Sequence, residues 1–195
     1  MSRADEERCA EYRQFARIDA AFRSGDLAAL RASVDDPAQV PNGPMPITVG
    51  SCLEYAIYHS PLAFIGTLLE IGADPNAPDD GGFSSLIAAL SCTNPHPGAR
   101  GRKDVVEILD LLLAFGADPD QRGINDYTAL HMAEGERNLA ALACLLAAGA
   151  DPTLRTRIDD YETPREMAER AGLVQFAELL AEHERRRRTL NRSHD

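Results

Sequence analysis

Apolar residues recur along the chain at a spacing typical of amphipathic helices. Val105, Ile108, Leu109, Leu112 and Leu113 stand at positions i, i+3, i+4, i+7 and i+8. This spacing places all five side chains on one side of a helix with 3.6 residues per turn. It predicts a helix that buries one apolar stripe and leaves its polar side in water.

A shorter apolar pattern precedes the most apolar segments. In it, a leucine is followed three residues later by an alanine, at Leu53 and Ala56, Leu86 and Ala89, and Leu130 and Ala133. Residues three apart lie on the same side of a helix. The small alanines leave room for a second helix to pack closely. The sequence therefore predicts pairs of short helices.

Three of these pairs end in the same four residues, Gly-Ala-Asp-Pro, which begin at Gly72, Gly116 and Gly149. Glycine supplies the left-handed conformation that ends many helices, and an Asp-Pro step prevents the helix from continuing. The glycines are 44 and 33 residues apart. A period near 33 residues indicates stacked repeating units, the third of which carries an 11-residue insertion, 94–104.

Two less regular units flank these three. The segment 20–27 belongs to the first, and the segment from Thr163 to Leu180 belongs to the last. Thr163 with Glu166, and Ser51 with Glu54, have the spacing of a capping box, in which each side chain satisfies a free backbone amide. Pro164 suits the first position of a helix, where no hydrogen bond is lost.

The segment Thr128-Ala129-Leu130-His131-Met132-Ala133, followed by Gly-Ala-Asp, resembles the Thr-Pro-Leu-His-x-Ala signature of ankyrin repeats. The resemblance extends over about residues 15–182. It implies an all-α solenoid of about five helix-turn-helix units, joined by β-turn or hairpin loops, with the outer two units as caps. The units then span about 15–45, 46–78, 79–122, 123–157 and 158–182, between a charged extension (1–14) and a basic tail (183–195).

Two residues depart from the family pattern. Arg165 stands where the family usually has leucine, and Glu134 stands where it usually has a second alanine. Both place a charge beside the expected core.

The formal net charge of −11 changes the expectation about partners. Residues 185–195 hold five arginines and one acid, so the remainder of the chain has 15 basic and 30 acidic residues. An acidic body disfavours nucleic acid or anionic lipid as the main partner and favours a basic protein surface. Arg185 to Arg188 follow the last predicted helix, where they complement the helix dipole as a solvated end or contact a nucleic acid or membrane.

Other composition signals favour a cytoplasmic chain. No run of about 18 apolar residues is present, so no membrane span is expected, and the charged start, 1–8, does not look like a secretory signal. Cys9, Cys52, Cys92 and Cys144 are 43, 40 and 52 residues apart, which is neither a disulfide framework nor a common zinc pattern. We therefore expect reduced thiols.

The family resemblance implies that partners bind at the turn tips and on the exposed side of the first helix of each unit. The residues at these positions with binding chemistry are Tyr58, His59, Asp80, Phe83, Asn125, Tyr127, Glu136, Asp159, Asp160 and Glu162. Phe83 and Tyr127 occupy equivalent tips and are candidate anchors, since aromatic side chains at the centre of an interface often dominate its affinity. The alternative is that both rings pack on their own turns.

The insertion 94–104 is rich in proline and glycine, which predicts a loop. Its Arg100, Arg102 and Lys103 are candidate partner-binding residues. It is either a functional loop or a tolerated insertion. Loop closure depends weakly on length, so we expect its deletion to change stability by no more than about 1 kcal/mol.

Catalytic chemistry has little support in the sequence. Cys92 and His96 form one Cys-x-x-x-His pair, and His59 is the only obvious third candidate for a metal site, whereas a structural zinc site needs four ligands. The family resemblance gives His131 a structural role, through hydrogen bonds that tie adjacent turns together. We therefore expect no cofactor.

The expected function is that of a non-catalytic adaptor or regulator, monomeric on its own, that binds another protein. The alternative is an acidic neutraliser that covers the basic surface of an enzyme or toxin. A remote alternative is a metal-dependent hydrolase that uses Cys92, His96 and His59.

The repeated Gly-Ala-Asp-Pro ending generates a first prediction. Gly116 and Gly149 have positive φ at the ends of their helices. The substitution Gly149→Ala then lowers the free energy of unfolding by about 1 kcal/mol, because alanine is strained in this conformation. Urea unfolding of the two proteins measures the difference. Ordinary helical angles at both glycines would contradict the prediction.

Overall fold

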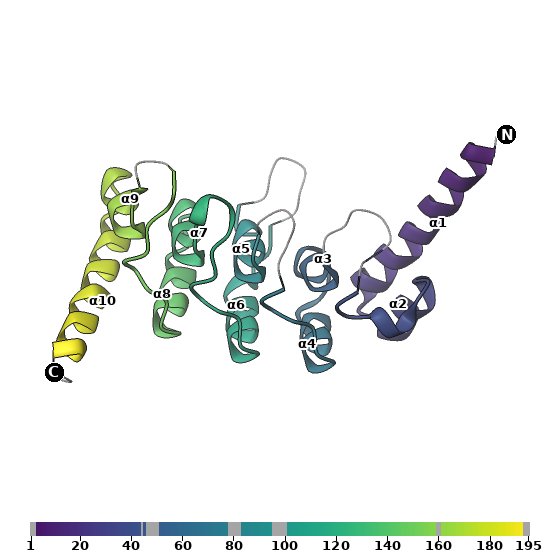
Figure 1. The fold of residues 1–195 in the computed structure, drawn as a ribbon, viewed down its shortest axis with the longest axis horizontal. Coiled ribbons are helices and arrows are strands. Elements are labelled where there is room, and N and C mark those ends of the chain that lie inside the picture. Colours follow the sequence, from purple (N-terminus) through teal and green to yellow (C-terminus); the bar gives the residue numbers. More distant parts are fainter. Residues whose placement is uncertain are drawn as a thin grey trace.

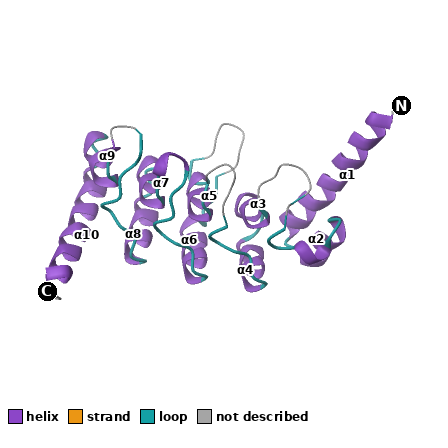
Figure 2. Cartoon of the chain, in the orientation of Figure 1, coloured by secondary structure: helices purple, strands orange, loops and turns teal. Residues whose placement is uncertain are grey.

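A computed structural model describes residues 3–43, 45, 51–77, 83–94, 101–158 and 161–192. Over these residues the chain forms ten α-helices and two short 3-10 helices, without a strand (Figure 2). The helices stand side by side as a row of pairs, and the two termini lie at opposite ends of the row (Figure 1). The predicted all-α fold is confirmed.

The helices follow one another as five pairs, the number of units that the sequence pattern predicts. The pairs are α1 (Arg3–Ser24) with α2 (Leu27–Ser33), α3 (Cys52–His59) with α4 (Leu62–Glu70), α5 (Ser85–Ser91) with α6 (Val105–Ala114), α7 (Ala129–Gly135) with α8 (Leu139–Ala147), and α9 (Pro164–Arg170) with α10 (Val174–Arg192). The 3-10 helices are η1 (Pro37–Gln39) and η2 (Ile124–Asp126). None of the described helices is long and apolar enough to cross a membrane.

The first and last helices are longer than the sequence analysis expected. Helix α1 is continuous from Arg3 to Ser24, so the expected boundary at residue 15 lies inside it. Helix α10 continues to Arg192. Most of the expected basic tail is therefore the end of the last helix.

One apolar core runs through the row of pairs. Each first helix contacts the next first helix, from α1 through α3, α5 and α7 to α9, and second helices contact each other from α4 to α10. Leu53, Leu86 and Leu130 are all buried at these contacts. Burial of one such side chain contributes roughly 2 kcal/mol, so stacking supplies the stability that short helices lack.

The first helices begin where the sequence places their caps. The Ser51 hydroxyl accepts a hydrogen bond from the Glu54 amide at 3.1 Å. The predicted capping box at Thr163 is confirmed, because the Thr163 hydroxyl accepts from the Glu166 amide and the Glu166 carboxylate accepts from the Thr163 amide. These bonds satisfy amides that have no partner within the helix.

The second helices of the central units end on glycine, as predicted. Gly116 and Gly149 have φ values of 89° and 96°. The amide of Gly149 donates to the Leu146 carbonyl at 3.1 Å, and that of Ala150 donates to the Leu145 carbonyl at 3.1 Å. This pattern closes the helix and sends the chain toward the next unit.

A ladder of side chains connects the turns that follow these glycines. Asn76 donates to the Gly116 carbonyl at 2.8 Å and accepts from the Asp118 amide at 2.7 Å. Asn42 makes the equivalent pair of bonds to the turn at Gly72 and Asp74, 2.7 and 3.0 Å long. One asparagine thus satisfies a donor and an acceptor of the neighbouring unit.

The ladder changes at the fourth unit, where an aspartate takes the place of asparagine. Asp120 accepts from the Asp151 amide at 2.7 Å, but an ionised carboxylate cannot donate to the Gly149 carbonyl. Arg187 of α10 supplies donors instead, to the carbonyls of Gly149 and Ala150 at 3.4 and 3.3 Å. This part of the predicted tail is bound to the body.

The charge at Arg165 is explained by its place in the last unit. Its side chain is 38% exposed and pairs with Glu169 at 2.8 Å and with Glu184 of α10 at 3.2 Å. The pair α9 and α10 stands at one end of the row of described helices (Figure 1). A polar outer face is what a terminal repeat requires for solubility.

The described ends of the insertion dock on neighbouring units. The Arg102 side chain, 13% exposed, donates to the carbonyls of Ile57 at 3.0 Å and Ser60 at 2.6 Å, at the end of α3. It also forms a bidentate ion pair with Asp104. At the other end, Asn94 donates to the Glu136 carbonyl at 2.7 Å. Deletion of 94–104 would remove these bonds, so we no longer expect it to leave stability unchanged.

His131 ties the fourth unit to the fifth. Its buried ring accepts a hydrogen bond on Nδ1 from the Thr128 amide at 3.1 Å, so the proton of the neutral ring is on Nε2, which lies 3.2 Å from the Glu162 carbonyl. Burial lowers the pKa of His131 to about 4. The structural role that the family resemblance implied is confirmed.

Arg102 generates a stability prediction. Arg102→Ala lowers the free energy of unfolding by about 2 kcal/mol, because two buried carbonyls and a carboxylate lose a charged donor. Lys103→Ala is the matched control, since Lys103 is exposed, and it changes stability by less than about 0.5 kcal/mol. Urea unfolding measures both. Equal effects would show that Arg102 does not stabilise α3.

His131 generates a pH prediction. Its pKa is lower in the folded chain than the unfolded value of about 6.5, so the unfolded chain takes up the proton first as the pH falls. The contribution of neutral His131 to the free energy of unfolding is therefore complete above about pH 6.5 and is lost as the pH falls toward 4. Between pH 7.5 and pH 5, the free energy of unfolding of the parent falls by about 2 kcal/mol more than that of His131→Gln. Glutamine can still form the cap but does not titrate. Urea unfolding at both pH values tests this, and equal losses would contradict it.

Candidate functional site

The first helices present a row of side chains at equivalent positions. This first-helix row consists of Tyr58 on α3, Ser91 on α5, Gly135 on α7 and Arg170 on α9. Ser91 is half-buried and the other three are exposed. The hydroxyls of Tyr58 and Ser91 lie 3.1 Å apart, so they link two neighbouring units. The row crosses the four C-terminal units.

His59 lies beside the start of this row. Its exposed ring is 4.3 Å from the ring of Tyr55, which donates a 2.7 Å hydrogen bond to Asp19. Partial loss of hydration lowers the pKa of His59, and the charge of Arg23 lowers it further. The ring is therefore neutral near pH 7 and can donate or accept a hydrogen bond.

The two predicted aromatic anchors are half-buried on their turns. Phe83 lines a small crevice with Leu53, Pro75 and Ser85, and the ring of Tyr127 lies 5.5 Å from that of His131. These positions agree with the alternative that both rings pack locally. A partner-binding role for either stays a prediction.

Three other apolar side chains at the turn tips are more exposed. Ile124 is 55% exposed, Ile158 is 42% exposed and Tyr161 is 63% exposed. We call these three residues the tip cluster. The candidate binding residues from the sequence included their neighbours Asn125 and Asp159 but none of these three. Large apolar residues in a turn segment otherwise rich in arginine and acids were the available signal.

Hydrogen bonds join the two turns that carry the tip cluster. The Arg157 amide donates to the Asn125 carbonyl at 2.9 Å, and Arg122 donates to the Arg155 carbonyl at 3.0 Å. Arg155 in turn donates to the Tyr161 carbonyl at 2.6 Å. These bonds restrain the described residues of the two turns relative to one another, and such restraint reduces the entropy lost on binding.

Strained backbone accompanies these exposed side chains. Asn125 and Tyr161 have φ values of 58° and 57°. The left-handed region is unfavourable for a bulky residue such as tyrosine and persists only where the surrounding structure enforces it. The Tyr161 side chain is 63% exposed and does not belong to the apolar core. That combination is typical of a functional surface.

The charged candidates divide into three groups. Glu162 is bound within the chain by Arg170, whose Nη2 lies 2.7 Å from its carboxylate. Arg102 is withdrawn as a partner-binding residue, because its donors are bound within the chain. Glu136, which is half-buried, and exposed Lys103 are placed where a partner could reach them. Asp80, Asp159, Asp160 and Arg100 lie outside the described residues.

Two of the four cysteines, Cys52 and Cys92, are buried and have the properties of structural thiols. Burial raises the pKa of Cys52 to about 12 and that of Cys92 to about 11. All four are free thiols, and Cys9 is exposed. His96, which the metal hypothesis required, lies outside the described residues. In the part of the chain that the structure describes, no three metal-binding side chains of His, Cys, Asp or Glu come together.

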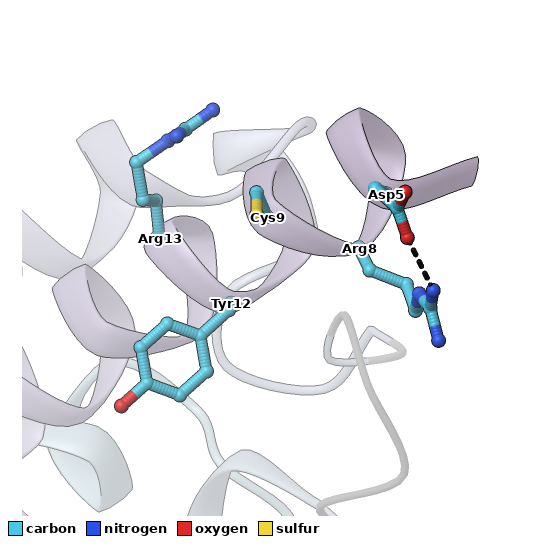
Figure 3. A pocket seen from close by; sticks show the side chains of 5 residues that line it. All are labelled: Asp5, Arg8, Cys9, Tyr12 and Arg13. Atoms are coloured by element: carbon cyan, nitrogen blue, oxygen red, sulfur yellow. Dashed lines mark hydrogen bonds and ion pairs between the residues drawn. The ribbon is translucent and has the colours of Figure 1, made fainter. Parts of the chain in front are cut away.

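Helix α1 carries a separate strip of exposed residues near the N-terminus. Figure 3 shows Asp5, Arg8, Cys9, Tyr12 and Arg13, which all belong to this one helix. Arg8 pairs with Asp5 at 2.6 Å, and Tyr12 is 73% exposed. No residue of another described element lines it. It is therefore an open helix surface and not an enclosed site.

Comparison with known proteins supports the repeat assignment. The family model for the ankyrin repeat matches residues 125–157, which contain α7 and α8. No curated protein matches the chain. Ankyrin repeats are generally interaction modules without catalytic activity, and they bind other proteins. The chain therefore contains an ankyrin repeat at residues 125–157, and the stacked helix pairs on either side of it have the helix-turn-helix form of such repeats.

Proposed function

We propose that the chain is a non-catalytic adaptor or regulator that holds a partner protein against its turn tips and first-helix row. The observation that carries the proposal is the tip cluster of Ile124, Ile158 and Tyr161, which is exposed, apolar and held rigid by hydrogen bonds. Exposed tyrosine on a rigid frame contributes binding area with little loss of conformational freedom.

The first-helix row supplies a second contact region beside the tips. Tyr58 and His59 stand at one end of it and Arg170 at the other, with the small Ser91 and Gly135 between them. Side chains of different size along one row allow a partner to insert its own side chains at the small positions. The partner contacts would extend over both regions.

The net charge of −11 favours a partner with a basic surface. Complementary charge speeds association and suppresses wrong partners. A neutraliser of a basic enzyme or toxin is one form that such a regulator could take. The free thiols and the acidic body suit a cytoplasmic chain that is monomeric until it binds.

The tip cluster generates the test of this function. The double substitution Ile124→Ser and Tyr161→Asn removes both apolar side chains, and asparagine tolerates the left-handed backbone at 161. We expect the affinity for the partner to fall by about 2 kcal/mol, roughly 30-fold, while the circular dichroism spectrum is unchanged. The partner is first identified by affinity capture from native lysate, and titration calorimetry then gives the affinity of each variant.

Val174→Ser is the matched control, since Val174 is 65% exposed but lies on α10, away from the turn tips. It removes exposed apolar surface without touching the tip cluster and is expected to bind normally. An unchanged affinity in the double variant would move the binding site away from the tips.

A further inference from the structure

Glu134 occupies a position that the neighbouring units fill with core residues. It stands four residues after Leu130, where the preceding units have Ile57 after Leu53 and Leu90 after Leu86. Ile57 and Leu90 are completely buried, and Glu134 is 4% exposed. A carboxylate therefore replaces an apolar side chain in the row of first helices, at the contact between α7 and α9. Such a replacement is unfavourable for folding unless the charge is fully compensated.

The chain compensates this charge only in part. The nearest cations are Arg170 and Arg137, but Arg170 donates both Nε and Nη2 to Glu162. Within the described residues, no hydrogen-bond donor lies within bonding distance of the Glu134 carboxylate. Loss of hydration raises the pKa of Glu134 despite the two arginines. One more donor with a positive charge would satisfy the group.

Space for such a donor exists beside Glu134. The next residue is Gly135, and a Cβ added there would meet no heavy atom within 4 Å apart from its chain neighbours and its own helix backbone. The Glu134 carboxylate oxygens are also not completely buried. The carboxylate therefore keeps a narrow contact with solvent next to an open position of the first-helix row.

The same region adjoins the tip cluster. Glu162 lies in the turn that carries Ile158 and Tyr161, and its charge influences Glu134. A segment of a partner that contacts the tips would therefore lie within reach of Gly135. The acidic body makes a basic segment the best complement.

We propose that Glu134 and the open position at Gly135 form a specific subsite for one arginine side chain of the partner protein. A guanidinium is planar and presents paired donors, so it can reach a carboxylate through a narrow opening and form two bonds with it. Glu134 lowers the stability of the fold but provides a binding group for the partner. This explains why an acid stands where the family resemblance calls for alanine. This inference rests on the proposed function, because it names the partner group that the same surface binds.

The test measures two properties of each variant, its Tm and its affinity for the peptide acetyl-Gly-Arg-Gly-amide. Binding is monitored by NMR titration of the backbone amide signals of the protein. Glu134→Gln removes the charge and keeps the shape, and Glu134→Ala restores the residue expected from the family. Glu107→Gln is the matched control, because it makes the same change of charge at an exposed acid on α6, in the layer of second helices. The peptide acetyl-Gly-Gln-Gly-amide controls for uncharged binding.

We expect both Glu134 variants to keep or raise the Tm and to weaken binding of the arginine peptide by at least about fivefold. Glu107→Gln changes the affinity by less than about twofold. In the parent, the shifted signals are those of Gly135 and its neighbours. Parent protein that does not bind the peptide, or equal weakening by Glu134→Gln and Glu107→Gln, would overturn the proposal.

A lower Tm in Glu134→Ala with unchanged peptide binding would also overturn it, since Glu134 would then serve the fold through Arg170. The tip variant Ile124→Ser with Tyr161→Asn separates this result from the proposed function. If that variant loses the partner while the Glu134 variants bind the arginine peptide normally, the adaptor function stands and only the subsite fails.

Discussion

The structure depends on the stacking of each helix pair against the next. A single pair of helices with seven to ten residues each cannot bury its apolar stripe or remain helical alone. Leu86 and Leu130 are buried because a neighbouring unit covers them, and the Gly-Ala-Asp-Pro ending returns the chain at the right distance for this contact. The asparagine ladder then fixes the spacing, because Asn76 reaches both a carbonyl and an amide of the next turn. The stacked helix pairs and the asparagine ladder together determine where the turn tips and the first-helix row lie.

The repeating features could be predicted from sequence because the same physical requirement recurs in each unit. The spacing of Leu130, Ala133 and Gly149 predicted a helix pair and its end, and the positive φ of Gly149 confirms the latter. The Thr163–Glu166 cap was equally predictable, because both partners lie within one turn of helix. Patterns whose partners lie this close together in the chain can be recognised from the sequence alone.

The contacts that break the repeat were not predictable in the same way. Arg102 binds carbonyls at the end of α3, more than 40 residues earlier in the chain, and no periodic pattern marks a backbone acceptor. Arg187 likewise substitutes for an asparagine of the ladder from a helix that the sequence pattern ended too early. At the candidate site, the sequence pattern indicated the turn that contains Asn125, but not the exposed side chains of Ile158 and Tyr161. Whether Phe83 or Tyr161 faces solvent depends on backbone angles that sequence alone does not reveal.

The docking of the insertion alters how the row of repeats can come apart. In a simple stack, each unit interacts only with its immediate neighbours, so units can detach one after another from either end. Here Asn94 binds the end of α7 and Arg102 binds the end of α3, so the third unit is fastened to the units on both sides by bonds beyond the apolar contact. The second, third and fourth units then form one cooperative block, and slow amide exchange with solvent would be concentrated there. The tip cluster lies where this block meets the final unit. The bonds from Arg157 to Asn125 and between His131 and Glu162 extend the block across that boundary, so the cluster would stay oriented while other parts of the row open.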